Sequence, residues 1–493
     1  MAEKADRKHV ELFKSWQLDS EKFVREALKV EMISTQQLQG LKEMDKLVQA
    51  KLKRAAGHDL TSEEEKYSKK IGLSIMSGHG TGKDCFASWI ILWFLFCFPF
   101  PKIPCTAPTG HQLKDVLWGE ISKWLRNSIC KDFLTWQSDK IYFNEHKGKE
   151  WFAVARTANP RATAEEQGET LAGFHERFVL FVVDEASGVA APVFKPIEGT
   201  LTGECNLVLL IFNPTRSKGF AVESHQKDRA RWACLQWNSE ESELVSKEQV
   251  ESMAKKYGRE SNTYRIRILG LPPSTDEHIL IQYDWAMDAI NREIDPMDTD
   301  PDVFGFDVGG GGDESVIVHR RGSIVYPIEG CNFDKSEELT GWALRRLLDI
   351  SPKFCMVDTI GIGWGIAGNL RSRQSTTDVL DINVSEGASQ DKRFYKLRDE
   401  LWWRLREDFE YGRISIPDDA LLIAELTTIK FEERPDGKIQ IESKKDMKTR
   451  GVESPNRADA LCLTEYFASE DMRRMNVVKK KKRAAMLSSW RTV

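Results

Sequence analysis

Short continuous apolar runs alternate with helix-favouring segments in the first half of the chain. Residues 1–70 are charged, favour helix and hold few glycines. From Gly72 to Gly270, apolar runs have the length expected of strands that are buried on both faces. They are Leu73–Met76, Trp151–Ala155, Phe178–Val183 and Leu207–Phe212. This alternation predicts an α/β domain, a parallel sheet with helices on its faces.

A second pattern begins at Val303, where strands and helices mix until about Phe467. Pro272 and Pro273 follow Gly270 and mark a boundary, and Asp295–Pro301 is a further stretch rich in proline and acids. We therefore expect a helical segment at 1–70, a first domain at 71–271, a linker at 272–301, a second domain at 302–468 and a basic, flexible tail at 469–493. The tail contains five consecutive basic residues, Lys479–Arg483, as interaction tails often do.

Composition narrows the class of protein without deciding it. The chain has 493 residues, of which 41% are hydrophobic, so it can build two or three cores. A net charge of −5 restricts any nucleic-acid contact to a local surface. The nine cysteines have no C-x-x-C spacing, which argues against a zinc site and for reduced thiols in the cytosol. Ala87–Phe98 is very apolar but too short to span a bilayer, and the charged N-terminus lacks a signal-peptide pattern.

The segment Ser77–Asp84, S-G-H-G-T-G-K-D, follows one apolar run and precedes another. Glycines in such a strand-to-helix turn aim backbone N–H groups at phosphate oxygens, and a lysine reaches the β- and γ-phosphates. We assign this nucleotide-binding role to Gly78, Gly80, Gly82, Lys83 and Asp84. The match to G-x4-G-K-[ST] is imperfect, because Ser77 replaces the first glycine and Asp84 the hydroxyl residue. A glycine-rich turn without a ligand is the alternative.

The run Phe178–Ser187, F-V-L-F-V-V-D-E-A-S, ends in two acids where a buried strand would emerge from the sheet. Ligands bind at that edge in open α/β folds. Asp184 is then placed to hold magnesium, and Glu185 to polarise the attacking water. The alternative is a strand that ends in acids by chance. The presence of a phosphate loop in the same chain argues against this alternative.

Three further acids form a second constellation. Asp307 ends a strand before a glycine-rich turn, Asp358 ends the strand Phe354–Asp358, and Asp459 lies in S-P-N-R-A-D-A-L at Ser454–Leu461. Separated acids of this kind suit two divalent cations that activate a water and stabilise the leaving oxygen in phosphodiester cleavage. Each aspartate alone could instead be a turn or cap residue. A basic cluster at Lys444, Lys445, Lys448 and Arg450 could hold the scissile strand or form a solvated face.

In this order, the motifs resemble the large terminase subunit of tailed bacteriophages, from about residue 30 to 467. Ser34–Leu41 looks like the adenine-contacting segment of that family, with Gln37 the better match, and Thr106–Gln112 looks like its strand-end motif. Asn213-Pro214-Thr215 looks like the coupling motif that senses the γ-phosphate. Asp307, Asp358 and Asp459 match the nuclease acids, and Asp313 sits where the family often has another. Asn456 replaces the first aspartate of the family's S-P-D-R-A-D-A-L and is not assigned to metal.

The resemblance implies a P-loop ATPase domain of the ASCE type followed by an RNase H-like nuclease domain with a mixed sheet. It implies ATP and Mg²⁺ as cofactors, with Mn²⁺ possible at the nuclease site. Implied partners are double-stranded DNA, a portal protein, a small terminase subunit and further copies in a ring, expected to be a pentamer. The implied location is the host cytoplasm and, transiently, the procapsid, with no place in the mature virion or at a membrane.

Two matters stay open at the level of sequence. An arginine finger must stabilise charge in the transition state, and Arg156, Arg161 and Arg216 are candidates among which the sequence does not choose. A helicase-nuclease of DNA repair is one alternative, but it should carry a full helicase motif series with a second motor lobe, and the second half of this chain carries the nuclease acids instead. A structural scaffold with a degenerate ATP-binding loop is the third alternative.

Overall fold

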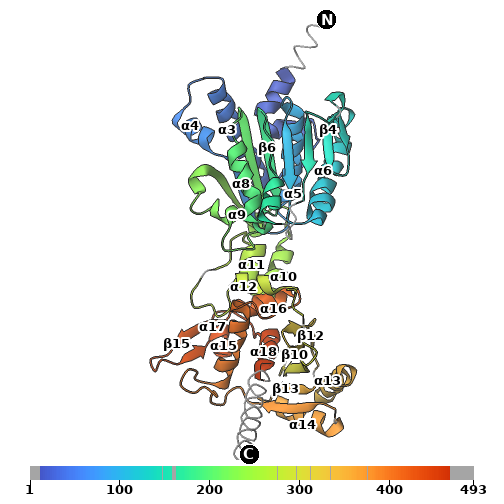
Figure 1. Ribbon diagram of the computed structural model, residues 1–493, viewed down its shortest axis with the longest axis vertical. Coiled ribbons are helices and arrows are strands. Elements are labelled where there is room, and N and C mark those ends of the chain that lie inside the picture. Colours follow the sequence, from blue (N-terminus) through green and yellow to red (C-terminus); the bar gives the residue numbers. More distant parts are fainter. Residues whose placement is uncertain are drawn as a thin grey trace, which may run out of the picture. The chain divides into compact units, whose positions relative to one another are not determined.

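The computed structural model describes residues 11–146, 148–157, 163–274, 276–295, 297–310, 313–333, 335–374 and 376–466. Arg161 and the basic run Lys479–Arg483 lie outside these residues. The chain divides into two compact units, of which unit 1 comprises 1–254 and 264–273 and unit 2 comprises 255–263 and 274–493. Figure 1 shows both units with many of their elements labelled.

Unit 1 contains an eight-stranded sheet with the strand order β3-β4-β5-β2-β6-β7-β1-β8. Neighbouring strands from β5 to β8 along this order run parallel, while β3 and β4 add an antiparallel edge. The strands are β1 (Gly72–Ser77), β2 (Lys102–Thr106), β3 (Leu134–Trp136), β4 (Lys140–Phe143), β5 (Phe152–Ala155), β6 (Phe178–Asp184), β7 (Cys205–Phe212) and β8 (Trp232–Trp237). The order places β7 between the strand that precedes the glycine-rich loop and the strand that ends at Asp184.

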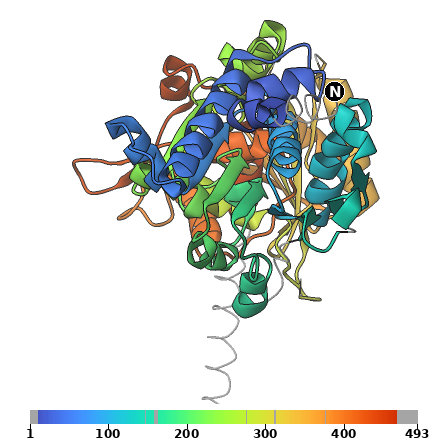
Figure 2. The same ribbon diagram turned by 90° about the horizontal axis from the view of Figure 1, so that it is seen from above.

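Helices cover both faces of this sheet, as the apolar runs predict. The helices are α2 (Ser20–Glu26), α3 (Thr35–Ala55), α4 (Ser62–Lys69), α5 (Lys83–Cys97), α6 (Trp118–Asn127), α7 (Ala164–Glu169), α8 (Ala191–Thr200) and α9 (Phe220–Glu223). One core joins α2, α3, α5 and α6 to one set of strand side chains, and another joins α8 and α9 to the alternate set. Figures 1 and 2 show this layered unit from two directions.

Short turns of other helix types complete unit 1, and two helices lie at the division of the chain. A π-helical turn spans Gln112–Leu117, and 3₁₀ turns span Ile129–Asp132, Asn144–His146, Ala186–Gly188, Arg229–Arg231 and Ser239–Glu241. The helices α10 (Lys247–Tyr257) and α11 (Asn262–Arg267) contain two of the three points at which the chain passes from one unit to the other, and the third lies between Pro273 and Ser274.

Unit 2 is built around a mixed sheet of six strands. The order is β11-β10-β9-β13-β14, and β12 pairs with β10 as well. The strands are β9 (Asp302–Asp307), β10 (Ser315–Arg321), β11 (Ile324–Val325), β12 (Glu329–Cys331), β13 (Phe354–Asp358) and β14 (Asp378–Ile382). β9 pairs antiparallel with β10 and parallel with β13, so Asp307 and Asp358 end adjacent strands on the same edge of the sheet.

The helices of unit 2 are α12 (Tyr283–Ala289), α13 (Ser336–Ile350), α14 (Gly363–Arg373), α15 (Leu397–Glu410), α16 (Ala420–Leu426), α17 (Lys444–Thr449) and α18 (Asn456–Leu463). A small hairpin of β15 (Phe431–Glu433) and β16 (Ile439–Ile441) joins α16 to α17. Within the stretch expected to be a linker, 272–301, α12 contacts α15 and α16 of this unit.

Two further expectations from composition can be compared with the structure. All nine cysteines lie in the described residues as unpaired thiols. In the part of the chain that the structure describes, no helix is both long and apolar enough to cross a membrane. The apolar run Ala87–Phe98 lies instead in α5 and just after it, in the core of unit 1.

Candidate functional site

The glycine-rich loop between β1 and α5 requires glycine at three positions. Gly80 and Gly82 have φ angles of 77° and 78°, in the left-handed region that other residues seldom adopt. A Cβ at Gly78 would lie 2.2 Å from Ser239 Oγ. α5 then starts at Lys83 without a side-chain cap, so its first backbone N–H groups are suited to an anion.

Lys83 lies at the centre of a network that joins the ends of three strands. Its Nζ is 2.9 Å from Glu185 Oε1 after β6 and 3.3 Å from Asn213 Oδ1 after β7. Asn213 also donates from Nδ2 to Ser77 O at 2.5 Å and from its backbone N to Glu185 Oε2 at 3.3 Å. The lysine, the glutamate and the asparagine that the sequence placed at one site are therefore in contact in the structure.

The acids of this site are crowded, and Glu185 has a strained backbone. Glu185 has a φ of 45°, which is uncommon for a non-glycine residue and often marks functional positions. Burial raises the pKa of Asp184 well above its ordinary value, and the nearby charges of Asp84 and Glu185 raise it further. Burial lowers the pKa of Lys83, but Glu185 and Asp84 outweigh this effect and hold it above its ordinary value. Such a set of carboxylates favours a bound cation.

Gln37, predicted to contact adenine, is only 2% exposed. Its Oε1 accepts from Ser34 N at 3.1 Å in the capping box of α3, and its Nε2 donates to Gly82 O at 3.1 Å. Gln37 therefore lies beside the loop, but an adenine contact would require its amide to leave these partners. In the strand-end motif Thr106–Gln112, the buried Thr106 hydroxyl has no hydrogen-bond partner among the residues that the structure describes.

The structure separates the arginine candidates without choosing a finger. Arg156 follows β5, is exposed and lines a hollow of about 380 Å³ with Thr157 and Glu166. Arg216 is half-buried, three residues after Asn213. His79, within the loop, has its pKa lowered to about 4 by burial and by the charges of Lys83 and Arg267, which keeps it neutral near pH 7.

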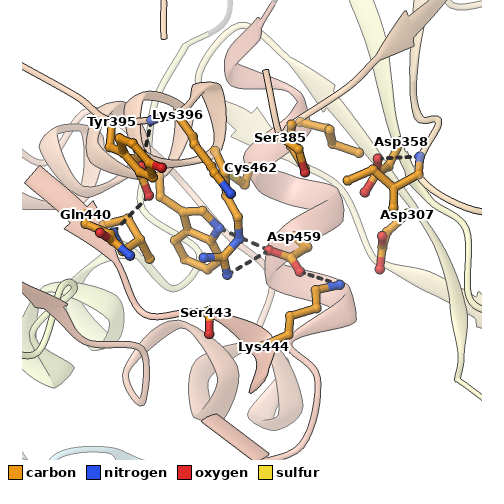
Figure 3. Close-up of a pocket in the computed structure, with 17 residues that line it drawn as sticks. Asp307, Asp358, Ser385, Tyr395, Lys396, Gln440, Ser443, Lys444, Asp459 and Cys462 are labelled. Atoms are coloured by element: carbon orange, nitrogen blue, oxygen red, sulfur yellow. Dashed lines mark hydrogen bonds and ion pairs between the residues drawn. The ribbon is translucent and has the colours of Figure 1, made fainter. Parts of the chain in front are cut away.

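In unit 2, Asp307, Asp358 and Asp459 line one cavity of about 270 Å³ (Figure 3). The first two end adjacent strands, and Asp459 lies in the first turn of α18, which packs on β9. Asp313 is exposed and is not among the residues that line this cavity, although its charge reaches Asp307. The sequence thus placed three acids on three separate elements, and the fold brings those three to one cavity.

Asp459 has a hydrogen bond on one carboxylate oxygen and an ion pair on the other. The indole nitrogen of Trp402 donates to Oδ1 at 3.0 Å, and the Arg398 guanidinium lies 3.7 Å from the same oxygen. The Lys444 ammonium lies 2.9 Å from Oδ2, on the side that faces Asp307 in Figure 3. The basic cluster of the sequence is divided, because Arg450 pairs with Glu442 instead.

The ionisation of the three acids differs with their surroundings. Burial raises the pKa of Asp307 to about 7 against the opposing charge of Lys444, and Asp459 and Asp358 add to the rise. Burial would raise the pKa of Asp459 too, but Lys444 and Arg398 outweigh it and hold that pKa below its ordinary value. Burial also raises the pKa of Asp358. Burial is thus the main reason why Asp307 and Asp358 hold their protons more tightly, whereas the neighbouring cations keep Asp459 ionised.

The donor chemistry fits a hard divalent cation, because three carboxylates share one cavity. Among the residues the structure describes, however, no three acids, histidines or cysteines form a ready-made metal centre. The Lys444 ammonium also neutralises one of the three acids, Asp459. Sequence reasoning missed Trp402 and Arg398, which only the packing of α15 against α18 brings to Asp459.

Comparison with known proteins agrees with these motifs. No protein-family model matches the chain. It is 28% identical over 434 residues to the "Probable terminase, large subunit" of Enterobacteria phage P7, a match that covers 81% of this chain and 86% of that protein.

Solved structures resemble it more distantly. The large terminase of the thermophilic bacteriophage D6E has 13% identity, covers 85% of this chain and 97% of its own, and has a TM-score of 0.38. The nuclease domain of the large terminase subunit of bacterial virus Sf6 has 20% identity, covers 38% and 98%, and has a TM-score of 0.35. The similarity to the P7 protein along most of the chain confirms the resemblance to large terminase subunits of tailed bacteriophages that the order of the motifs predicted.

Proposed function

We propose that this chain couples ATP hydrolysis in unit 1 to movement of double-stranded DNA and cuts that DNA with a metal-dependent endonuclease in unit 2. The observation that carries the proposal is the presence of two separate carboxylate sites, one beside a phosphate-type loop and one in a cavity at a sheet edge. The similarity to a probable terminase large subunit supports the same assignment.

In the ATPase site, the backbone N–H groups of Gly78–Gly82 and the Lys83 ammonium would bind the phosphates. Asp184 and Asp84 supply carboxylate oxygens for Mg²⁺, which suits that cation. A γ-phosphate bound to Lys83 would compete with Glu185 for the ammonium. Nucleotide binding would then weaken the 2.9 Å ion pair, and Glu185 would be free to orient the attacking water.

Asn213 is the residue best placed to pass this change on. It contacts Lys83 through Oδ1 and Glu185 through its backbone N, and it holds the end of β1 through Ser77 O. Two residues further on, the Thr215 hydroxyl lies 3.0 Å from the Ser187 hydroxyl, and this hydrogen bond links the segments after β6 and β7. A change at the γ-phosphate would thus alter the segment after β7, as a coupling element must. Arg156, Arg161 and Arg216 remain the candidates for the arginine finger.

In the nuclease cavity, Asp307, Asp358 and Asp459 would hold Mg²⁺ or Mn²⁺. Bound divalent cations supply an activated water and stabilise the leaving oxygen of the phosphodiester. Trp402 and Arg398 fix the orientation of Asp459. Lys444 would give up its contact with Asp459 Oδ2 when that oxygen turns to a cation.

The biological role follows from joining these two activities. The chain would cut concatemeric genome DNA and drive it through a portal into an empty procapsid. It would do so as a ring, expected to be a pentamer, with a small terminase subunit. It would act in the host cytoplasm and leave before the virion matures.

Three assays on the purified chain test the proposal. ATP hydrolysis, EDTA-sensitive cleavage of plasmid DNA, and protection of DNA from added nuclease in the presence of procapsids are all expected. ATPase activity without any cleavage would leave a motor alone, and cleavage without ATPase would leave a nuclease alone. Hydrolysis and strand separation without procapsid-dependent protection would favour the helicase-nuclease alternative.

A further inference from the structure

A segment of exposed apolar side chains follows the carboxylate Asp358 directly. Ile360, Ile362 and Trp364, here called the apolar ridge, are 49%, 51% and 72% exposed. Among the described residues, no other large hydrophobic side chain has a larger exposed fraction than Trp364. Single exposed apolar residues are ordinary, but three within five positions concentrate exposed apolar side chains in one short segment.

The ridge is fixed in place beside the cavity. A Cβ at Gly363 would lie 1.9 Å from Asp358 O, so only glycine lets α14 begin so close to this acid. Ile360 N donates to Asp358 Oδ1 at 3.0 Å, and Thr359 N donates to Ile382 O at 3.0 Å. The ridge therefore cannot fold away without moving Asp358.

The apolar ridge lies close enough to the cavity to contact a substrate that is bound there. Ile360 lines the cavity together with Asp307 and Asp358. The Cβ position of Gly363 is 3.6 Å from Val308 Cβ, directly after Asp307. A Cβ at Gly361, Gly365 or Gly368 would meet nothing within 4 Å, so the surface around Trp364 is open to a large ligand.

Charge divides the rim of the cavity into two kinds of surface. Lys396, Arg398 and Lys444 line it with cations, which are suited to phosphate oxygens. The ridge offers no charge, so a DNA strand held by those cations would meet it with its bases and not with its backbone. Apolar side chains that enter DNA in this way partly unstack a base step and bend the duplex.

We propose that the apolar ridge inserts into duplex DNA beside the scissile phosphate, with Trp364 stacking on an exposed base. This inference rests on the proposed nuclease function and deepens it. The ridge opens the duplex locally so that the phosphodiester reaches the three carboxylates. Intact duplex then needs the ridge, whereas DNA that is already unpaired does not. Cutting should also favour the flexible TA and CA steps, which unstack most easily.

The test compares Trp364→Ala, Trp364→Phe and wild type on a matched duplex and on the same duplex with a central run of mismatches. Trp364→Ala should reduce kcat/KM on the matched duplex roughly 5- to 150-fold, the effect of losing one stacked base. On the mismatched duplex the loss should be smaller, because no base step has to be opened there. Trp364→Phe should retain most activity, and Trp364→Ala should lose the preference for flexible steps.

Tyr411→Ala is the matched control, because Tyr411 is an aromatic residue of unit 2 with 66% exposure and does not line the cavity. It should cut both duplexes as wild type does. If Trp364→Ala loses the same activity on both duplexes, the proposed insertion into DNA is wrong, and Trp364 only stabilises the structure of the site. No loss of activity on either duplex would also overturn the proposal, and it would indicate that the apolar ridge contacts a protein partner instead of DNA. If wild type cuts neither duplex, the proposed nuclease function itself fails.

Discussion

The indole nitrogen of Trp402 donates a 3.0 Å hydrogen bond to Oδ1 of Asp459. Trp402 is fully buried on α15, and Asp459 lies in the first turn of α18. Because Oδ1 is held in this way, Oδ2 is the oxygen that faces Lys444 and the cavity. The tryptophan thus sets which carboxylate oxygen a cation can reach.

Replacing this hydrogen bond without changing the packing tests its role. Trp402→Phe keeps a buried ring and removes the N–H group. Loss of a group that orients a metal ligand commonly costs about 10- to 100-fold in metal affinity or activity. We expect the Mg²⁺ concentration for half-maximal DNA cleavage to rise by about that factor, with ATPase activity unchanged. Cleavage rates across a Mg²⁺ titration measure this.

Trp403 provides the matched control. Its indole donates to Glu407 Oε1 at 3.0 Å on the same helix, and it does not line the cavity. Trp403→Phe should therefore leave the Mg²⁺ dependence of cleavage as in wild type. If the two variants respond alike, Trp402 serves the packing of α15 and not the orientation of Asp459.

The three acids of the cavity should be separately required. Asp307→Asn, Asp358→Asn and Asp459→Asn each keep the side-chain size and remove one charge, so each should abolish EDTA-sensitive cleavage while ATP hydrolysis persists. Asp381→Asn is a control, because that acid pairs with Arg371 on the surface of the same sheet. A protein lacking all three acids that still cuts plasmid DNA would exclude this site.

Much of this arrangement could be predicted from local pattern. β1, β6 and β7 are continuous apolar runs, and the chemistry lies directly after them, at Lys83, Glu185 and Asn213. Continuous burial on both faces is a property of the strand itself, so it is visible in the sequence. The carboxyl ends of parallel strands then meet at one edge, which brings the motifs together without further information.

The features of the two sites that the sequence did not predict depend on contacts between residues far apart in the chain. Trp402 and Asp459 are 57 residues apart, and nothing in the amphipathic pattern of α15 distinguishes Trp402 from its neighbour Trp403. The amide of Gln37 is likewise used by Ser34 and Gly82, which only the docking of α3 beside the loop reveals. Such pairings arise from tertiary packing and leave no local signal.

The two activities should separate by mutation. Lys83→Ala removes the ammonium that neutralises Glu185 and would bind phosphate, and Glu185→Gln removes the group that orients water. Removing such transition-state groups commonly costs about 10²–10³ in rate. We expect ATP hydrolysis to be lost in both and plasmid cleavage to remain. Lys46→Ala, which breaks an exposed pair with Glu43, should change neither. Near-normal hydrolysis in Lys83→Ala would contradict the assignment of the loop.

Asp45 should make the stability of unit 1 depend on pH. Burial raises its pKa to about 7, even though its carboxylate accepts from Ser20 N at 2.9 Å. The folded state then binds a proton that the unfolded state releases between about pH 4 and pH 7, so the free energy of unfolding falls as pH rises through this window. Each pKa unit corresponds to about 1.4 kcal/mol, which makes the change a few kcal/mol at most.

Denaturant unfolding at several pH values measures this dependence. Asp45→Asn should lose stability less steeply than wild type between pH 4 and pH 7, because it has no proton to release there. Asp59→Asn is the control, since Asp59 is exposed in the loop between α3 and α4. Parallel curves for wild type and Asp45→Asn would show that Asp45 titrates normally.

Asp84 should make nucleotide binding unusually dependent on magnesium. Its Oδ1 lies 3.8 Å from Lys83 Nζ, and burial together with Glu185 raises its pKa against the charge of Lys83. Without a divalent cation, this carboxylate would repel phosphate oxygens; with one, its oxygens are good ligands. We expect the ratio of ATP affinities with and without Mg²⁺ to shrink in Asp84→Asn, and hydrolysis to weaken. Asp84→Thr should retain much hydrolysis, because a hydroxyl commonly serves at this position. Equal magnesium dependence in wild type and Asp84→Asn would mean that Asp84 only stabilises the first turn of α5 against the helix dipole.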